Sequence, residues 1–430
     1  MSVPHLVTVL MVASAFQLFV VPVGEVYLPL SLAFAFACVP LLDWSAALRH
    51  RVARCACLLF AAQAASLAWS ADRPLGVREI LFSSTFLMGV AAGVTLVARA
   101  PGAVLPALRV YCVAALAQSV AVIAFRAAPD VESQFWSSPL ARVVINPNGL
   151  DALFTINGSN NVLDPAKAGG FLLNANIAGA WGALLFFTSL ACFRGSNRWA
   201  RAAVAGTHLL GVVACGSKAS LAIICVAPVV AMVLFGRPGS GRQSRVRVIV
   251  PVLAALAATA GVIAWTFVAG SEYGSEAAHA LESRSILWAH AWDEFLRKPV
   301  QGQGYGGWIE ALVIRSSLAA KFGLRQSFPP HNSLLILWSQ SGLPALAAGV
   351  ATAAAAFRHL RRPAGTPDQH FAFCATAAYA FVFIQCLGEN YGIFGDPHMN
   401  VPVGVLIGVA AGLPVVGAAA PAAARRRWFR

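Results

Sequence analysis

Runs of about twenty apolar residues recur along the whole chain, separated mostly by short polar turns. A helix needs about 20 apolar residues to cross a bilayer, and it satisfies its own backbone hydrogen bonds inside lipid. The pattern therefore predicts an all-α polytopic membrane protein with about 12 transmembrane helices in a single domain, residues 1–430. We expect the spans at about residues 5–21, 26–42, 55–70, 78–98, 104–125, 171–192, 200–215, 219–235, 248–268, 332–356, 370–387 and 399–417.

Two of these spans carry local signals of their own. The first has no basic segment before it and no clear cleavage site after it, so we interpret it as a retained helix rather than a signal peptide. In the span at about 332–356, Gly342 and Pro344 predict a kink.

The longest polar interruption lies between the ninth and tenth expected spans, over residues 269–331. We interpret it as a loop with short helices. One of them is an amphipathic helix on the membrane surface that begins at Arg284 and carries Trp288, Trp292, Phe295 and Leu296 at helical spacing. The run Gly302–Gly307 then predicts a flexible turn, although glycines also let a backbone approach a ligand. A membrane protein that keeps so many polar residues between two apolar spans is expected to do its chemistry there.

Charge adds an orientation to this picture. The net charge of +14 comes from 31 Lys and Arg against 17 Asp and Glu, and the mean hydropathy is +0.70. On the expected spans, 19 of the 31 basic residues fall on one side of the membrane, against two acidic residues, Asp43 and Asp368. The positive-inside rule makes that side cytoplasmic, so both termini are expected there and the 269–331 loop on the outer side. The basic charge thus needs no nucleic-acid partner.

The nine cysteines fall in or beside apolar spans, so no disulfide framework follows. No Cys/His cluster has zinc spacing, and no acidic pair on the outer side suits a metal. We therefore expect no metal and no cofactor.

His331 stands directly before an apolar helix, behind Pro329 and Pro330. Asn332 or Ser333 can cap that helix, and the positive end of the helix dipole disfavours an imidazolium at this place. A neutral imidazole can take a proton from a hydroxyl. His331 is therefore the candidate general base, and a polar interfacial side chain without chemistry is the alternative.

Two cations stand near other helix starts on the outer side. Ser217 is expected to cap a helix that begins with Lys218, where a bound anion would favour a cation that the bare helix disfavours. Arg284 has a guanidinium that can bind phosphate through two donors. The alternatives are an extension to the membrane interface for Lys218 and, for Arg284, an ion pair with Glu282 or with an acid of the first outer loop.

Three further residues are candidates for support. Glu389, at the outer end of the span at about 370–387, could orient His331, serve as a second base or cap its helix. Asn174 and Asn176, which begin the span at about 171–192, could bind sugar or phosphate, and capping explains one of them. One base and two cations together predict a reaction on a phosphate-bearing lipid, with Arg and Lys balancing the charge in place of Mg²⁺.

The chain resembles the O-antigen ligase family, within the wider group of O-antigen ligases and polymerases. The short turn Gly216-Ser217-Lys218 carries part of the resemblance. The remaining motif residues are Arg284, Trp288, Pro299, Gly302, Gly304, His331-Asn332 and Gly342.

The resemblance implies a GT-C-like glycosyltransferase of a Gram-negative inner membrane. The donor would be O-antigen polysaccharide on undecaprenyl pyrophosphate, and the acceptor a sugar hydroxyl of lipid A-core on the periplasmic side. His331 would be the general base, Arg284 and Lys218 with Ser217 would bind the pyrophosphate, and the anomeric carbon would invert without a metal. An O-antigen polymerase, a protein O-oligosaccharyltransferase and, in another class, a lipid-linked oligosaccharide flippase remain alternatives.

Overall fold

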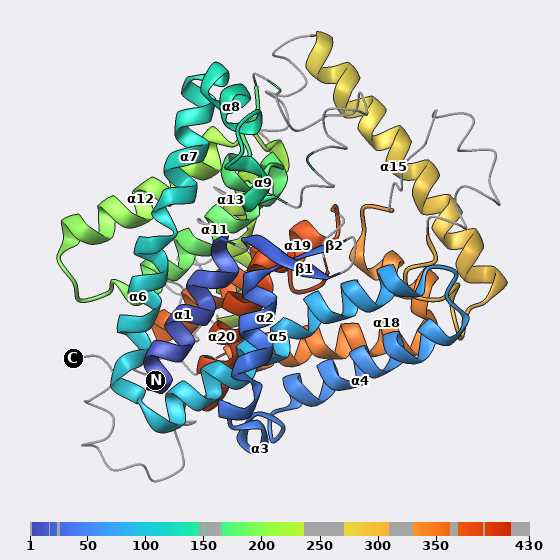
Figure 1. The fold of residues 1–430 in the computed structure, drawn as a ribbon, viewed down its shortest axis with the longest axis horizontal. Helices are drawn as coiled ribbons and strands as arrows, with labels where there is room; N and C mark the ends of the chain where they lie inside the picture. Colours follow the sequence, from blue (N-terminus) through green and yellow to red (C-terminus); the bar gives the residue numbers. More distant parts are fainter. Residues whose placement is uncertain are drawn as a thin grey trace, which may run out of the picture.

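Helices dominate the structure, a computed structural model that describes residues 2–16, 18–23, 26–145, 150, 164, 166–235, 271–308, 330–361, 369–389 and 392–413 (Figure 1). The elements before residue 150 are α1 (Val3–Phe16), β1 (Phe19–Val23), β2 (Val26–Pro29), α2 (Leu30–Cys38), η1 (Val39–Leu41), α3 (Trp44–Ala47), α4 (Arg51–Ser66), η2 (Leu67–Trp69), α5 (Arg73–Arg99), η3 (Pro101–Ala103), α6 (Val104–Ala114), α7 (Leu116–Ala127), α8 (Pro129–Trp136) and α9 (Ala141–Val144). The later elements are η4 (Gly170–Leu172), α11 (Ala175–Cys192), α12 (Arg198–Ala214), α13 (Lys218–Phe235), α15 (Ser271–Arg297), α18 (Ser333–Leu360), α19 (Gln369–Cys386) and α20 (Pro397–Gly412).

Several helices have the length and apolar composition of membrane spans. Among the described residues, six segments meet both conditions: Arg51–Trp69, Arg73–Arg99, Pro101–Ala127, Ala175–Cys192, Ser333–Leu360 and Gln369–Cys386. Shorter apolar helices accompany them at Val3–Phe16, Leu30–Leu41, Lys218–Leu234 and Pro397–Gly412. They support a polytopic membrane fold. The number of twelve spans stays a prediction, because the ninth expected span, 248–268, lies outside the described residues.

The first expected span is shorter than predicted. α1 ends at Phe16, and β1 and β2 then form a small antiparallel ladder in which Val23 lies opposite Val26. The cause is local, because Pro22 lacks the backbone donor that a helix interior needs and the valines around it favour an extended chain. The described chain is therefore helical with one two-stranded ladder, rather than strictly all-α.

α5 and α20 form the tightest helix pair of the core. α5 carries Gly89 and Gly93 four residues apart, and α20 carries Gly404 and Gly408 with the same spacing. A Cβ atom on any of the four would lie 2.2–2.5 Å from a backbone oxygen of the other helix. Small residues at this spacing let two helix backbones meet inside a membrane.

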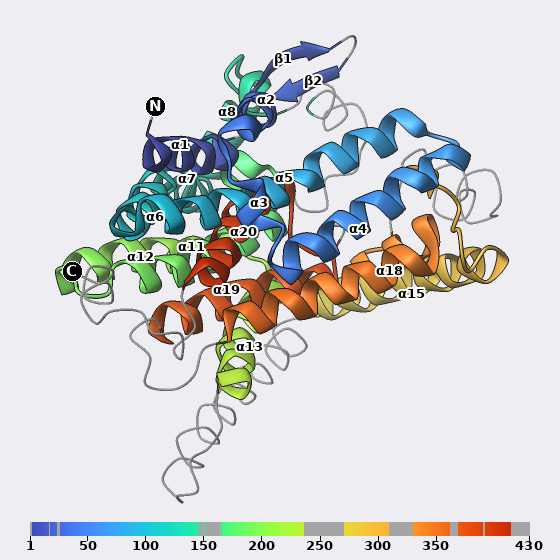
Figure 2. The same cartoon turned by 90° about the horizontal axis from the view of Figure 1, so that it is seen from below.

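α4 packs between α5 and α18, and α15 lies along the other side of α18 (Figure 2). The predicted kink in α18 is confirmed, since Gly342 has non-helical backbone angles, φ +71° and ψ −172°. This kink divides α18 into a first part that carries the site and a second part that continues the bundle.

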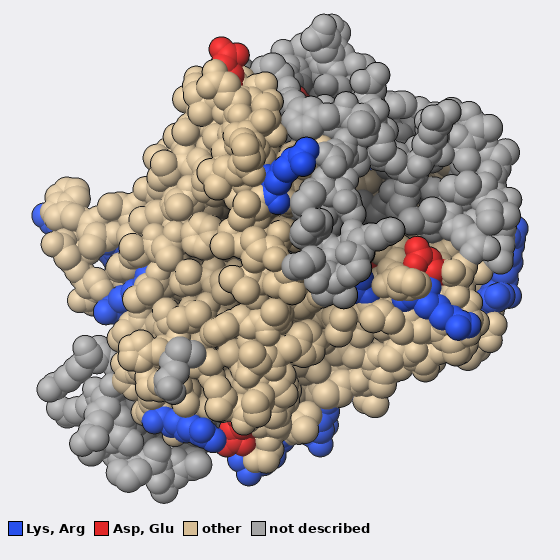
Figure 3. All heavy atoms as spheres, viewed as in Figure 1, with Lys and Arg blue, Asp and Glu red and all other residues tan. Residues whose placement is uncertain are grey.

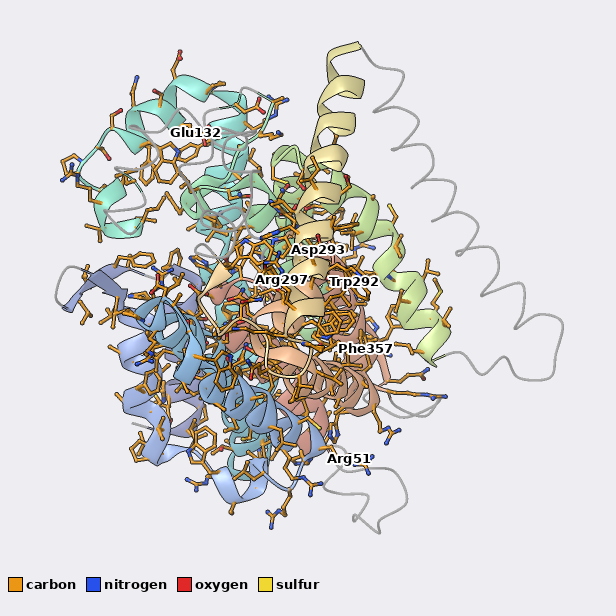
Figure 4. All side chains as sticks on the ribbon, turned by 90° about the vertical axis from the view of Figure 1, so that its right-hand side faces the viewer. Arg51, Glu132, Trp292, Asp293, Arg297 and Phe357 are labelled. Atoms are coloured by element: carbon orange, nitrogen blue, oxygen red, sulfur yellow. The ribbon has the colours of Figure 1, made fainter. Side chains whose placement is uncertain are left out.

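The contacts and directions of the helices show which helix ends lie together. At one end, Nε of Arg109 on α6 donates to the carbonyl oxygen of Cys192, where α11 ends, at 2.8 Å. At the other end, α11 and α18 begin and α19 ends. Figure 4 shows Arg51, which begins α4, far from Glu132 of α8. α11 and α18 thus have candidate site residues where they begin and arginines where they end.

Among the described residues, Lys and Arg are sparse on the side drawn in Figure 3. Lys and Arg side chains form small, separate groups around a mostly uncharged area there. Such a surface suits contact with lipid.

Candidate functional site

His331 directly precedes α18 and its cap. Asn332 is the N-cap, and its Oδ1 accepts hydrogen bonds from the backbone N–H groups of Leu334 (3.0 Å) and Leu335 (3.2 Å). The predicted cap is therefore confirmed. It places the imidazole beside the positive end of a 28-residue helix that is kinked farther along.

The backbone at His331 is strained, with φ at +46°. The left-handed region costs a non-glycine residue about 1–2 kcal/mol, so neighbouring contacts must hold it. Nε1 of Trp288 on α15 donates to the carbonyl oxygen of Pro330 at 2.5 Å. On the other side, Oγ of Ser333 donates to the carbonyl oxygen of Cys386 at 2.8 Å. α15 and α19 thus fix the chain on both sides of the imidazole.

Glu389 is the hub of the site, and its side chain is only 8% exposed. Its Oε1 accepts hydrogen bonds from Nδ2 of Asn176 at 2.9 Å and from Nη2 of Arg284 at 3.3 Å. Its Oε2 lies 3.6 Å from Nδ1 of His331. One carboxylate therefore joins residues from α11, α15 and the start of α18.

The carboxylate of Glu389 lies on the Nδ1 side of the His331 ring. A carboxylate beside Nδ1 favours the proton on that nitrogen, which leaves the lone pair on Nε2. A separation of 3.6 Å exceeds a hydrogen bond, but catalytic contacts often tighten only when substrate binds. Orientation of His331 by Glu389, one of the roles considered for it, stays a prediction.

Arg284 has a partner that the alternatives above did not include. Its guanidinium pairs with Glu389. A guanidinium has five N–H donors, so one contact at Nη2 leaves donors for a ligand, and the side chain is 32% exposed. Arg284 can therefore hold Glu389 and meet an anion at the same time.

The helix that presents Arg284 is longer than predicted. α15 is one helix from Ser271 to Arg297, not one of several short helices, and it does not begin at Arg284. It contains no proline, and its residues 276–282 are mostly the good helix formers Ala, Glu and Leu. Arg284 thus lies inside a helix, one turn before Trp288, which fixes both side chains relative to α18.

The residues of the predicted apolar face of α15 do not share one environment. Leu287, Ala291 and Phe295 are buried, whereas Trp292 and Leu296 are exposed. The Phe295 ring lies 3.6 Å, centroid to centroid, from a tryptophan ring of α18. The helix is therefore turned so that it packs on α18 rather than only on a membrane surface.

Lys218 and Ser217 lie where the sequence predicts them. Ser217 precedes α13 and accepts a hydrogen bond at Oγ from the backbone N–H of Ser220, at 3.3 Å, so Lys218 is the first residue of the helix. α13 begins close to α11, since a Cβ on Gly179 would lie 2.2 Å from Oγ of Ser220. Gly179 follows Asn176 by three residues on α11, so the start of α13 lies near the hub.

The side chains of Asn174 and Asn176 make different contacts: Asn174 caps α11, and Asn176 contacts Glu389. Oδ1 of Asn174 caps α11 by accepting from the backbone N–H groups of Asn176 (2.8 Å) and Ile177 (3.4 Å). The side chain of Asn176 instead reaches Glu389. Asn174 supports the site by fixing where α11 begins.

The run Gly302–Gly307 packs its backbone closely against other parts of the chain. Together with its flanks, residues 299–308, it forms what we call the glycine clasp, which binds the kink of α18. The backbone N–H of Gly304 donates to the carbonyl oxygen of Gln340 at 2.8 Å, and that of Leu343 donates to the carbonyl oxygen of Pro299 at 3.0 Å. The clasp thereby joins the end of α15 to α18.

Close backbone contact explains the glycines of the clasp. Gly304 has φ +99°, and a Cβ there would lie 2.3 Å from Cα of Ser70. Gly302 has φ +69°, and a Cβ there would lie 2.5 Å from the carbonyl oxygen of Gln340. A side chain at either position meets backbone that cannot rotate away.

A cavity of about 270 Å³ lies beside the first part of α18. Its walls come from α4, α5, the glycine clasp, α18 and residues 392–394. Gln63, Arg78 and Glu79 are polar residues of these walls that the sequence analysis did not select. Their only sequence signal is a charged pair within an expected span. Burial raises the pKa of Tyr305, another wall residue, so its hydroxyl stays neutral.

The fold and this site define a class: a helical membrane protein with a histidine, a carboxylate and cations gathered where several helices begin or end. The sequence profile of the family described as O-antigen ligase matches residues 202–349. This segment contains Lys218, Arg284 and His331. Over this third of its length the chain is similar to the O-antigen ligase family. A search of curated proteins finds no match to the chain.

Proposed function

We propose that the protein is an O-antigen ligase that transfers O-antigen polysaccharide from undecaprenyl pyrophosphate to a sugar hydroxyl of lipid A-core. The observation that carries the proposal is the contact of Glu389 with both Arg284 and His331. It brings a base and a cation together at an end of the helix bundle, within the segment that matches the family.

The proposed reaction is a single displacement. Nε2 of His331 takes the proton of the acceptor hydroxyl while that oxygen forms a bond to the anomeric carbon of the donor sugar. The bond from this carbon to the pyrophosphate oxygen breaks, and undecaprenyl pyrophosphate leaves with the electron pair. Attack opposite the leaving group inverts the anomeric carbon.

The leaving group carries negative charge that must be balanced. Arg284 and Lys218 are proposed to bind the pyrophosphate and to stabilise it as it leaves, with Ser217 at the start of α13 as a further donor. A helix N-terminus favours an anion in the same way. The reaction is proposed to need no metal.

The proposal also specifies how the protein is oriented in the membrane and how many spans it has. The site faces the periplasm from a Gram-negative inner membrane, both termini are cytoplasmic, and about twelve GT-C-like spans surround residues 269–331. The positive-inside distribution of arginines supports this orientation.

The test uses the purified protein with undecaprenyl-pyrophosphate glycan, lipid A-core and excess EDTA, beside a reaction without lipid A-core. We expect glycan on lipid A-core in the first reaction only. Longer lipid-linked glycan in both reactions would identify a polymerase instead. Absence of product in both would favour a protein acceptor or a flippase.

The base is tested in the same assay. His331→Ala should lower the rate about 10²–10⁴-fold. His359→Ala is the matched control, because His359 lies in the last turn of the same helix and should leave the rate unchanged. Equal rates for the two variants would remove His331 from the chemistry.

A further inference from the structure

The cavity beside α18 is the part of the site to which neither the family match nor the sequence assigns a role. Ser333, Ile336, Leu337 and Gln340 border it from α18. These positions follow the i, i+3, i+4, i+7 spacing of one helix face. Trp338, which contacts α15, lies on another face. The cavity and Arg284 are therefore on different sides of the helix that begins beside His331.

The polar groups of the cavity are balanced in charge. Nη2 of Arg78 lies 3.0 Å from Oε1 of Glu79, and the two side chains are 41% and 42% exposed. An ion pair of this kind has no net charge with which to attract a pyrophosphate. It offers donors on one side and acceptors on the other, which suits a neutral ligand that has both.

One buried acceptor of the wall has no hydrogen-bond donor among the described residues. Gln63 is 2% exposed, and its Oε1 accepts no hydrogen bond from the part of the chain that the structure describes. A buried acceptor without a donor costs about 1–3 kcal/mol, so a ligand or a water that donates there is favoured. Tyr305 and Trp308 supply aromatic walls.

The size of the cavity limits the ligand. A volume of about 270 Å³ is near the lower end of the range of about 300–1,000 Å³ for small-molecule pockets. Such a space suits one sugar ring better than a lipid tail or a long glycan. Sugar hydroxyls both donate and accept, and the apolar face of a sugar ring packs on aromatic side chains.

We infer that this cavity binds the terminal sugar ring of the acceptor, with Glu79 and Gln63 accepting from its hydroxyls and Arg78 donating to them. The inference rests on the proposed function. It gives the two substrates opposite sides of α18: the donor pyrophosphate lies toward α13 and α15, and the acceptor sugar lies toward α4 and α5. His331 then stands between them, two residues before Ser333 in the cavity wall.

The kinetic test compares Arg78→Gln and Glu79→Gln with Arg73→Gln. Arg73 is in the first turn of the same helix and does not line the cavity. A partly exposed ion pair contributes little to stability, so the variants should fold. Each cavity variant should raise the acceptor KM about tenfold or more, because hydrogen bonds to charged groups are lost. Donor KM should change less than about twofold, and Arg73→Gln should change neither.

Two kinetic results would overturn the inference. One is an unchanged acceptor KM in both cavity variants. The other is a rise in donor KM in place of acceptor KM, which would make the cavity part of the pyrophosphate site.

A binding measurement separates this inference from the proposed function. Methyl glucoside is added to the detergent-purified protein without any donor, and its contact with the protein is followed by saturation-transfer NMR. We expect a signal for the wild type that is lost in Glu79→Gln and kept in Arg73→Gln. If the transfer assay gives no product, this signal still supports a sugar site. No signal, or an equal signal in all three proteins, contradicts it.

Discussion

Replacement of Glu389 by glutamine tests the central contact of the site. The two side chains have the same shape, so an amide oxygen can still accept from Asn176 and Arg284 at the place of Oε1. The amide nitrogen then takes the place of Oε2, 3.6 Å from Nδ1 of His331. It carries hydrogens, so it favours a lone pair on Nδ1 and a proton on Nε2. On the proposed mechanism, Nε2 of His331 then carries a proton and cannot accept one from the acceptor hydroxyl.

The magnitude follows from the geometry. In the proposed reaction His331 takes the acceptor proton and becomes an imidazolium beside Glu389. Two unit charges 3.6 Å apart attract by about 5 kcal/mol at an effective dielectric constant of about 20. The imidazole side chain is 24% exposed, so solvent reduces this attraction. We therefore expect a rate loss of about 10²–10³-fold, at about 1.4 kcal/mol for each factor of ten.

The assay is single-turnover transfer at saturating donor and acceptor. Asp293→Asn is the matched control, because it neutralises an exposed acid of α15 and should leave the rate unchanged. Thermal unfolding in detergent shows whether the variants remain folded. A Glu389→Gln protein that is folded and transfers glycan at the wild-type rate would refute the role of Glu389 in orienting His331.

Three further predictions concern how the site is held and what it binds. Gly304→Ala should lower the free energy of unfolding by about 1–3 kcal/mol. Gly102→Ala should change it little, because a Cβ there meets nothing within 4 Å. Thermal unfolding compares the two variants, and equal melting temperatures would contradict the close packing of the clasp. Trp288→Phe removes the Nε1 donor that binds the carbonyl oxygen of Pro330 before His331. It should lower kcat about tenfold with donor KM unchanged. A change confined to donor KM would disprove this positioning role. Lys218→Ala should raise donor KM about tenfold or more, and Lys218→Arg should restore it. A titration with lipid-linked glycan measures donor KM in both variants. A wild-type donor KM in the alanine variant would exclude a contact of Lys218 with phosphate.

Local chemistry made some of the site predictable. Asn332 and Ser217 stand before long apolar runs, and a short polar side chain there satisfies free backbone donors. Their caps, and therefore the places of His331 and Lys218 at helix starts, follow from a few neighbouring residues. The kink at Gly342 was predictable for the same reason.

The partners of Glu389 could not be predicted in this way. Asn176 and Arg284 lie 213 and 105 residues away from it along the chain. No local spacing records which helix ends meet, since that depends on how α11, α15 and α19 pack. The cavity presents the same difficulty, because its walls come from five separate parts of the chain.

The glycine clasp shows why a motif residue need not contact a substrate. Gly302, Gly304 and Gly342 lie in the segment that matches the family. At each of them a side chain would collide with the backbone of another segment. The clasp fixes the end of α15 on the kink of α18, and this sets the distance from Arg284 to the start of α18, where His331 lies. A larger residue in the clasp would therefore change the relation of cation to base without touching either. Loss of activity in such a variant would be evidence about the position of α15, and only a change at Arg284 or His331 itself would be evidence about the chemistry.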